Sequence, residues 1–366
     1  MEKVVIVTNI PNHYRIPLFN QLNLLLLEER IKLTVIFGAA GYAFRKNKVE
    51  LETCEFNYKV LEKSGGDNGN ITYLGLTDCL KIEDPDLIVV SGFNKATLKT
   101  MFHSFITKIP YFIWSGSVEI GNRKTSFLKK LYRRVVINYA KGFIAYGSMA
   151  KQYMHELGAP LDRVYAIGNS VDAAKISAMV EKEREVSLVR RLLYLGYLTP
   201  LKNLFPLLKV IDELRKVRTD FIFDVVGDGE SRKELELEVQ KKGLEDLIKF
   251  HGFKQRDEVP KYYAKADVFL FQTEADIWGL VLNEAMSAAI PTLVSKRAGA
   301  AVDLIIEGET GFVVDFHNTE EVAKKINWIL NHPKEAKRIG EKAAQFIEKE
   351  YSIGVVASRF KEAIVR

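Results

Sequence analysis

Hydrophobic positions in the first half of the chain form short apolar runs separated by longer amphipathic stretches. The runs are rich in Val, Ile and Phe, which is typical of buried strands. We predict strands over residues 4–8, 31–37, 86–91, 111–114, 143–146 and 164–167. Helix-length stretches, such as 16–27 and 149–157, separate these runs. Short strands that alternate with helices indicate βαβ units and a parallel sheet.

The second half of the chain repeats this rhythm. We predict strands over residues 192–195, 221–226, 248–250, 268–271 and 292–295. The highly charged stretch 181–185 separates the two halves and suggests a linker. A chain of 366 residues is long enough for two domains with separate cores. We therefore predict an α/β protein with Rossmann-like domains over 1–170 and 189–345, a linker over 171–188, and a helical C-terminus over 346–366.

Composition narrows the class of protein. The chain is 47% hydrophobic and 27% charged, which is ordinary for a soluble globular protein. No apolar run approaches the roughly 20 residues that span a bilayer, and the first residues lack the features of a signal peptide. The two cysteines, Cys54 and Cys79, give no basis for a disulfide framework or a cysteine metal site. We expect a cytoplasmic protein.

The net charge of +6 is concentrated in one segment, residues 123–134. This segment carries no acidic residue, and its cations are Arg123, Lys124, Lys129, Lys130, Arg133 and Arg134. Apolar residues such as Phe127 and Leu131 interleave with the cations, so the segment predicts a basic amphipathic helix that lies on an anionic membrane surface. The alternative is a solvated helix that packs these apolar side chains into its own domain. No nucleic-acid motif accompanies the segment, and we expect no nucleic-acid partner.

The segment 273–286 carries the clearest candidate chemistry. Asp276 and Glu284 stand eight residues apart and flank Gly279 at the predicted start of a helix. Eight residues is just over two helical turns, so both carboxylates are expected on roughly the same face. The free N–H groups and positive dipole end of a helix start suit a phosphate, and carboxylates accept hydrogen bonds from hydroxyls. This arrangement fits a sugar joined to a nucleotide.

The residues from Asp276 to Met286, Asp-Ile-Trp-Gly-Leu-Val-Leu-Asn-Glu-Ala-Met, resemble the signature of the family 4 retaining glycosyltransferases. Asp276 stands at the first carboxylate position, where that family usually has Glu, and Glu284 stands at the second. The resemblance is strong over residues 190–315 and looser over the first half. It implies the GT-B fold, in which two Rossmann-like doubly wound domains face a central cleft, with the helix at 346–366 crossing back to the first domain. It also implies an acceptor-side first domain, a donor-binding second domain, and no metal or other cofactor.

The resemblance also implies roles for single residues. Glu284 would accept hydrogen bonds from the donor ribose, Asp276 would contact the transferred sugar, and Lys202 would hold the donor diphosphate. Tyr197 stands where the family has a second cation, and Arg297 or Lys296 is a candidate for that missing charge. Further donor contacts are expected at Tyr197, Gly227, Phe253, Trp278, Gly279, Leu280 and Arg297.

The acceptor side is less defined, because the histidine that many family members place there has no clear counterpart. We consider Tyr14, Arg15, Ser115 and Glu119 as acceptor-side candidates. The alternative is that these residues only cap a helix or close a turn.

These observations favour a retaining glycosyltransferase that moves a sugar from a nucleotide sugar to a saccharide or lipid-linked acceptor in polysaccharide or lipopolysaccharide assembly, at the inner membrane face. Three alternatives remain. A nucleotide-sugar epimerase on a similar fold is disfavoured, because such enzymes lack the Ala-Met helix signature in this context. A dinucleotide oxidoreductase is disfavoured because no Gly-x-Gly-x-x-Gly turn follows the first strand. A non-catalytic partner of another transferase is left open by Tyr197 at the cation position.

Overall fold

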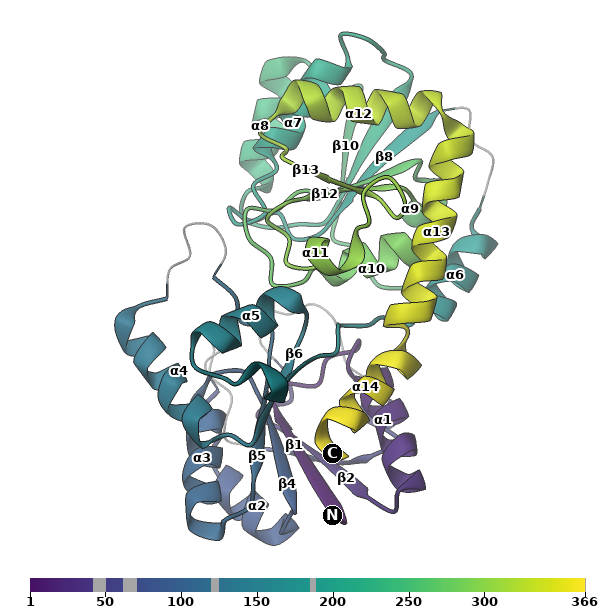
Figure 1. The fold of residues 1–366 in the computed structure, drawn as a ribbon. Coiled ribbons are helices and arrows are strands. Elements are labelled where there is room, and N and C mark those ends of the chain that lie inside the picture. The colour runs from purple at the N-terminus through teal and green to yellow at the C-terminus, as the bar shows by residue number, and fades with distance from the viewer. Residues whose placement is uncertain (42–50, 62–70, 120–124, 185–188, 366) are drawn as a thin grey trace. The chain divides into compact units, whose positions relative to one another are not determined.

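The computed structural model describes residues 1–41, 51–61, 71–119, 125–184 and 189–365 (Figure 1). The chain divides into two compact units. Of the described residues, the first unit comprises 1–119, 125–170 and 353–365, and the second comprises 171–352. Each unit holds one sheet, in which every pair of neighbouring strands is parallel.

The first sheet has the strand order β3-β2-β1-β4-β5-β6-β7. Its strands are β1 (Lys3–Thr8), β2 (Lys32–Phe37), β3 (Asn57–Val60), β4 (Leu87–Ser91), β5 (Tyr111–Ser115), β6 (Gly142–Ala145) and β7 (Val164–Ala166). β1 pairs with β2 on one side and with β4 on the other, so the direction of winding reverses between β1 and β4. Such a reversal separates the loops at the carboxyl ends of the two strands.

Helices cover both faces of this sheet. They are α1 (Ile16–Glu28), α2 (Leu76–Glu83), α3 (Lys95–Thr107), α4 (Phe127–Tyr139), α5 (Ser148–Glu156) and α14 (Ile353–Val365). Successive side chains of β1 pack on opposite faces of the sheet. Val5 and Val7 belong to one buried cluster, and Val4 and Ile6 belong to the other. The helix α14 lies beside α1 (Figure 1) and joins the second of these clusters. There the Phe360 ring centroid lies 5.2 Å from the Trp114 ring centroid.

The second sheet has the strand order β10-β9-β8-β11-β12-β13. Its strands are β8 (Arg190–Leu195), β9 (Phe221–Val226), β10 (Ile248–Gly252), β11 (Val268–Phe271), β12 (Thr292–Ser295) and β13 (Phe312–Val314). Winding reverses here between β8 and β11. The helices are α6 (Ala173–Lys182), α7 (Phe205–Leu214), α8 (Arg232–Lys242), α9 (Pro260–Lys265), α10 (Leu280–Ser287), α11 (Ala301–Leu304), α12 (Thr319–Asn331) and α13 (Pro333–Tyr351).

Every strand predicted from an apolar run is present, with its ends within two residues of the prediction. Two strands, β3 and β13, were not predicted from the sequence. β3 lies at the edge of its sheet and has a polar, partly exposed sequence from Asn57 to Val60, so it lacks the apolar run of a buried strand. β13 is only three residues long.

The domain boundaries differ from the prediction at two places. The segment predicted as a linker, 171–188, contains α6, which packs against α9 and α10 and belongs to the second unit as far as it is described. The terminal helix predicted over 346–366 is two helices: α13 runs to Tyr351 within the second unit, and only α14 belongs to the first. The helix α13 belongs to the second unit because its residues Ala336 and Ile339 pack into that unit's core.

Candidate functional site

Two loops of the second unit meet at the carboxyl ends of β8 and β11, where the winding reverses. Lys202 lies in the loop after β8, and Asp276 lies in the loop after β11. The Lys202 ammonium donates a hydrogen bond to Oδ2 of Asp276, and both side chains are partly buried. Ligands of doubly wound sheets bind at such reversal points. The structure therefore brings two of the predicted catalytic residues together at the expected edge of the sheet.

The Lys202–Asp276 pair has few other partners. The Lys202 ammonium lies 5.3 Å from the centroid of the Phe271 ring, and Oδ1 of Asp276 accepts a 3.3 Å hydrogen bond from the Trp278 amide. The two opposite charges neutralise each other. An incoming phosphate would compete with Asp276 for the Lys202 cation, and a sugar hydroxyl would compete with Lys202 for the carboxylate.

The backbone on both sides of Asp276 is fixed by the loop after β12. The Asp276 amide donates to the Arg297 carbonyl at 3.3 Å, and the Gly299 amide donates to the Asp276 carbonyl at 2.9 Å. A Cβ on Gly299 would lie 2.1 Å from the Ile277 carbonyl oxygen, so this close approach of two loops requires glycine. Asp276 is thus held by the backbone and does not depend on Lys202 for its position.

The helix α10 starts directly after this loop. Gly279 is its N-cap residue, and no side chain of the described residues caps the helix there. Trp278 is buried, and its Nε1 donates to Oδ1 of Asn283 at 2.8 Å, which fixes the turn that enters the helix. The N–H groups of the N-cap residue Gly279 and of Leu280, the first residue of α10, are therefore available to an anion.

Gly279→Ala is expected to destabilise the second unit by about 1–3 kcal/mol. Gly279 has φ 91°, and an added Cβ would lie 2.3 Å from Cζ of the Phe271 ring. The measurement is urea unfolding followed by tryptophan fluorescence. Gly354→Ala in α14 is the control, since an added Cβ meets nothing there within 4 Å, and unfolding of the Gly279→Ala protein at the wild-type midpoint would contradict the expectation.

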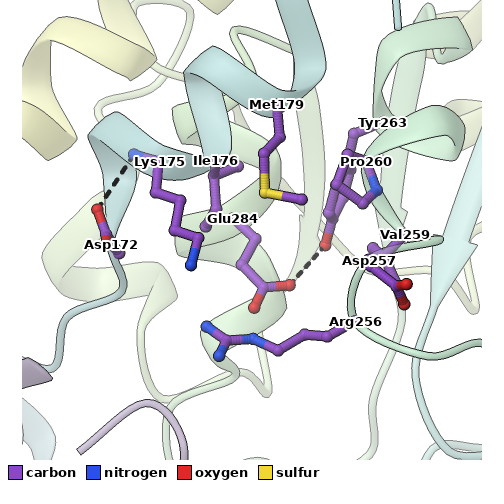
Figure 2. A pocket seen from close by; sticks show the side chains of 10 residues that line it. All are labelled: Asp172, Lys175, Ile176, Met179, Arg256, Asp257, Val259, Pro260, Tyr263 and Glu284. Carbon is purple, nitrogen blue, oxygen red and sulfur yellow. Dashed lines mark hydrogen bonds between the residues drawn. The ribbon is translucent and has the colours of Figure 1, made fainter. Parts of the chain in front are cut away.

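Glu284 lies further along α10 and faces a separate pocket. Tyr263 donates a 2.9 Å hydrogen bond from its hydroxyl to Oε2 of Glu284. The pocket has a volume of about 210 Å³ and is lined by Asp172, Lys175, Ile176, Met179, Arg256, Asp257, Val259, Pro260, Tyr263 and Glu284 (Figure 2). Figure 2 shows the Lys175 and Arg256 side chains extending toward the space beside the Glu284 carboxylate.

The electrostatics of Glu284 are dominated by burial. Burial raises the pKa of Glu284 above its ordinary value, and the Tyr263 hydrogen bond and the Arg256 charge only partly offset this. Burial and the neighbouring carboxylate likewise raise the pKa of Tyr263, so Tyr263 stays a hydrogen-bond donor at neutral pH. Ionisation of Glu284 is therefore unfavourable in its buried position. Carboxylates with perturbed pKa values are common at functional sites.

Asp276 and Glu284 are not two groups of one cluster. Asp276 pairs with Lys202, whereas Glu284 bonds to Tyr263 in the pocket of Figure 2. Asp276 precedes α10, which begins at Leu280, so the two carboxylates do not share a helical face as their spacing predicted.

Arg297, proposed to supply a missing cation, has other partners. Its Nη1 lies 3.3 Å from Oδ1 of Asp315, and its Nε lies 3.6 Å from Oε2 of Glu274. Lys296 also pairs with Asp315, at 2.6 Å. The hydrogen bond from Lys296, with the Arg297 charge, lowers the pKa of Asp315 to about 2. These cations anchor the loop after β12, and neither is paired with Asp276.

Glu274 is a connecting residue that the sequence analysis missed. It accepts hydrogen bonds from Nδ2 of Asn203 and Nε2 of Gln272, both at 3.1 Å, and Nε2 of His317 lies 2.8 Å away. Burial opposes its ionisation, but these bonds and the nearby charges outweigh burial and lower the pKa of Glu274. Glu274 thus ties the loop that carries Lys202 to the loop that carries Asp276. Glu274 could have been identified from the sequence by its position between the predicted strand β11 and Asp276.

The remaining donor-side residues follow neighbouring strands of the same sheet. Tyr197 follows β8, and its side chain is more than half exposed. Gly227 follows β9, where an added Cβ would lie 1.8 Å from the Gly196 carbonyl oxygen. The glycine is therefore needed for contact between two loops, whereas the sequence suggested contact with a ligand. Phe253 follows β10 and is partly buried.

The structure gives Arg15 an internal role in the first unit. Arg15 is buried and donates to the hydroxyl of Thr8 at 2.8 Å and to the hydroxyl of Tyr146. Its guanidinium stacks 4.3 Å from the Trp114 ring centroid. Arg15 therefore ties together the carboxyl ends of β1, β5 and β6. Its neighbour Tyr14 is partly buried.

Ser115 and Glu119 also close local structure. Ser115 is buried, and its Oγ accepts a 3.0 Å hydrogen bond from the Ser117 amide. Glu119 accepts from the Thr125 amide at 2.9 Å and pairs with Lys130 at 3.0 Å, which together lower the pKa of its carboxyl. These contacts favour the alternative of turn and helix capping for both residues.

Metal ligands do not gather anywhere in the part of the chain that the structure describes. No group of three or more His, Cys, Asp and Glu side chains there is placed to hold an ion.

Part of the chain matches a family model and several curated proteins. Residues 178–346 match the family model described as Glycosyl transferases group 1. The sulfoquinovosyl transferase SQD2 of Arabidopsis thaliana is 35% identical over 156 residues, which cover 42% of this chain and 29% of that protein. The lipopolysaccharide 1,2-N-acetylglucosaminetransferase of Salmonella typhimurium is 32% identical over 181 residues, which cover 47% of each protein. The chain thus spans less than half the length of either curated relative.

Solved structures resemble the chain over nearly its whole length. The Anabaena protein Alr3699/HepE, crystallised in complex with UDP, has a TM-score of 0.79 at 20% sequence identity, with 99% of both chains covered. This likeness and the two parallel sheets confirm the predicted GT-B class of fold.

Proposed function

We propose that this chain is a glycosyltransferase that takes its sugar from a nucleotide sugar bound by the second unit. The observation that carries this proposal is the Lys202–Asp276 pair beside the uncapped start of α10. The pair lies at the reversal point of a doubly wound sheet and within the segment that matches the transferase family model. A cation, free amides and a carboxylate at one place suit a diphosphate joined to a sugar.

The proposed roles follow from the contacts of Lys202, Asp276 and Glu284. The donor diphosphate binds the α10 amides and attracts the Lys202 ammonium away from Asp276. Asp276, released from its partner, then accepts hydrogen bonds from hydroxyls of the sugar. Glu284, in the pocket of Figure 2, accepts from the ribose hydroxyls and is held by Tyr263. Lys202 is positioned to stabilise the negative charge that develops on the leaving diphosphate.

The proposed reaction is a retaining transfer. The bond between the sugar's anomeric carbon and the diphosphate oxygen breaks, and a bond from an acceptor hydroxyl oxygen forms on the same face. The acceptor's proton passes to the departing diphosphate, so the chain's own residues supply positioning and charge stabilisation. The reaction uses no metal. We assign the chain to the retaining family 4 subtype on the residues from Asp276 to Met286.

The acceptor is proposed to be a saccharide or a lipid-linked saccharide. The name of the Salmonella relative, a lipopolysaccharide transferase, supports this class of acceptor.

We also propose that residues 123–134 bring the protein to an anionic membrane surface at the inner face. Within α4, Phe127 is 76% exposed, which supports this over packing into the unit's core. Arg123 and Lys124 lie outside the described residues, and none of the described helices is long and apolar enough to cross a bilayer.

Thermal-shift measurements with UDP-glucose, UDP and GDP-mannose test the donor proposal. A nucleotide sugar that binds only the folded protein stabilises it by about 2.7 kcal/mol at one hundred times its dissociation constant. The stabilising compound should then show nucleoside diphosphate release when saccharide acceptors are added. Lys337→Met, on the exposed surface of α13, is the control and should respond like wild type. No stabilisation by any nucleotide sugar in a broad panel would remove the proposal.

A further inference from the structure

The helix α3 of the first unit exposes an apolar stripe. Leu98, Phe102, Phe105 and Ile106 are all exposed, and their spacing places them on one face of the helix. Ile106 is 78% exposed and Phe102 is 57% exposed. Apolar residues at helical spacing ordinarily face a core, so an exposed stripe marks an interaction surface. We refer to these four residues as the α3 stripe.

The α3 stripe continues onto α4. Exposed apolar side chains on α4 are Phe127, Leu128, Leu131, Val135 and Tyr139. The Phe105 and Tyr139 rings meet edge to face, with their centroids 6.5 Å apart. Figure 1 shows the two helices side by side within the unit. The two stripes therefore form one apolar surface on neighbouring helices.

A cationic hollow lies between the first halves of α3 and α4. Its volume is about 330 Å³, and it is lined by Phe93, Asn94, Lys95, Leu98, Lys129, Tyr132 and Arg133. These lining residues include no carboxylate, and Lys95 and Lys129 form no ion pair with any other described residue. The Arg133 guanidinium lies 5.2 Å from the Phe93 ring centroid, which holds it beside the hollow. Three cations around one small hollow suit a phosphate group.

We propose that the surface formed by α3 and α4 docks on a bilayer that contains anionic lipid. The apolar stripes enter the headgroup region, and the hollow takes the phosphate of one lipid. This inference rests on the membrane part of the proposed function and extends it from the basic segment of α4 to α3 and the hollow. The combination of apolar side chains and cations is the one expected of a helix surface that lies in the membrane interface.

Charge decides between a bilayer and a second copy of the chain. In a two-fold dimer that used this surface, the surface of one copy would face the same surface of the other. The cations of the two hollows would then lie close together and repel each other. Anionic lipid complements both the cations and the apolar stripes. The partner we infer is therefore lipid.

The test is co-sedimentation with phosphatidylcholine vesicles, with and without phosphatidylglycerol. The full chain should sediment with the anionic vesicles at low salt, much less with the neutral vesicles, and progressively less as salt is added. Lys95→Glu removes one attraction and adds one repulsion at the hollow, so it should weaken binding by about 25-fold. The double variant Phe102→Ser with Ile106→Ser should weaken binding by about tenfold or more.

Matched controls come from the second unit. Leu237→Ser on α8 removes an apolar side chain that is 64% exposed, and Lys337→Glu on α13 reverses a charge on an exposed side chain. Both should bind vesicles like wild type. All the variants change exposed residues, and circular dichroism with thermal melting confirms that each is folded.

The outcomes separate this inference from the claims on which it rests. If Arg134→Glu on α4 weakens binding while Lys95→Glu and the Phe102–Ile106 variant bind normally, the role of α3 and the hollow is refuted and the membrane proposal stands. If wild type ignores anionic vesicles at low salt, both fall. A concentration-dependent dimer that Ile106→Ser dissociates, with no vesicle binding, would make the partner a second copy. Donor binding by the second unit is measured separately and is affected by none of these results.

Discussion

Lys202→Met is expected to lower kcat/KM for sugar transfer by about 10²- to 10³-fold. Lys202 is the cation of the site at the ends of β8 and β11, and methionine keeps the length of the side chain while removing its charge. The ammonium donates a hydrogen bond to Asp276, and during transfer it is proposed to stabilise the departing diphosphate. The measurement is nucleoside diphosphate release at several donor concentrations, with Lys337→Met as the matched exposed control.

Asp276→Asn provides the complementary test of the same pair. It removes the negative charge that pairs with Lys202, so nucleoside diphosphate should bind as tightly as to wild type or more tightly. Transfer should nevertheless fall, because the carboxylate that accepts the sugar hydroxyls is lost. Equal weakening of UDP binding in Lys202→Met and in Asp276→Asn would contradict the proposed exchange of partners.

Glu284→Gln is the second change with a large expected effect, a loss of about 10- to 100-fold in donor affinity. Glutamine has the shape of Glu284 and can still accept from Tyr263, but it loses the charge that strengthens hydrogen bonds from ribose hydroxyls. The measurement is calorimetric titration with the nucleotide sugar that gives the largest thermal shift. Tyr263→Phe should give a smaller loss, because it removes only the group that orients Glu284.

The Glu284→Gln change should lower donor affinity but should not lower the stability of the folded protein. Burial raises the pKa of Glu284 above its ordinary value of 4.5, so the folded protein binds this proton more tightly than the unfolded chain. The contribution of Glu284 to stability is therefore fully present below pH 4.5 and is lost as pH rises through the raised value. At neutral pH, Glu284→Gln should melt at or above the wild-type temperature, and the difference should shrink in acid. A Glu284→Gln protein that melts well below wild type but binds donor normally would make Glu284 a structural residue.

The sequence predicts the sheets well because their strands are buried on both faces. The runs from Val4 to Thr8 and from Phe221 to Val226 are almost entirely buried, so their apolar character is visible without any partner. The edge strand β3 is hidden for the opposite reason, since its residues are exposed or partly exposed. The helix break after Tyr351 was not predicted from the sequence. The extended residue Ser352 separates α13 from α14, and the apolar faces of the two helices enter the cores of different units.

The sequence predicts which loops form the candidate site, but it does not predict which side chains contact one another there. The motif residues Lys202 and Asp276 meet because both loops leave the same edge of the sheet. The partners of Glu284 and Arg297 are Tyr263, Glu274 and Asp315, which belong to other helices and loops of the second unit, and no local spacing predicts these pairs. Arg15 shows the same limit, because a loop cation that looks available in sequence is buried against Trp114.

The most direct test of the central claim is a crystal structure of the protein soaked with UDP. We predict the diphosphate at the first amides of α10 with the Lys202 ammonium turned toward it, and the ribose hydroxyls on Glu284. Nucleotide bound elsewhere, with the Lys202–Asp276 pair intact and the pocket at Glu284 empty, would contradict the account.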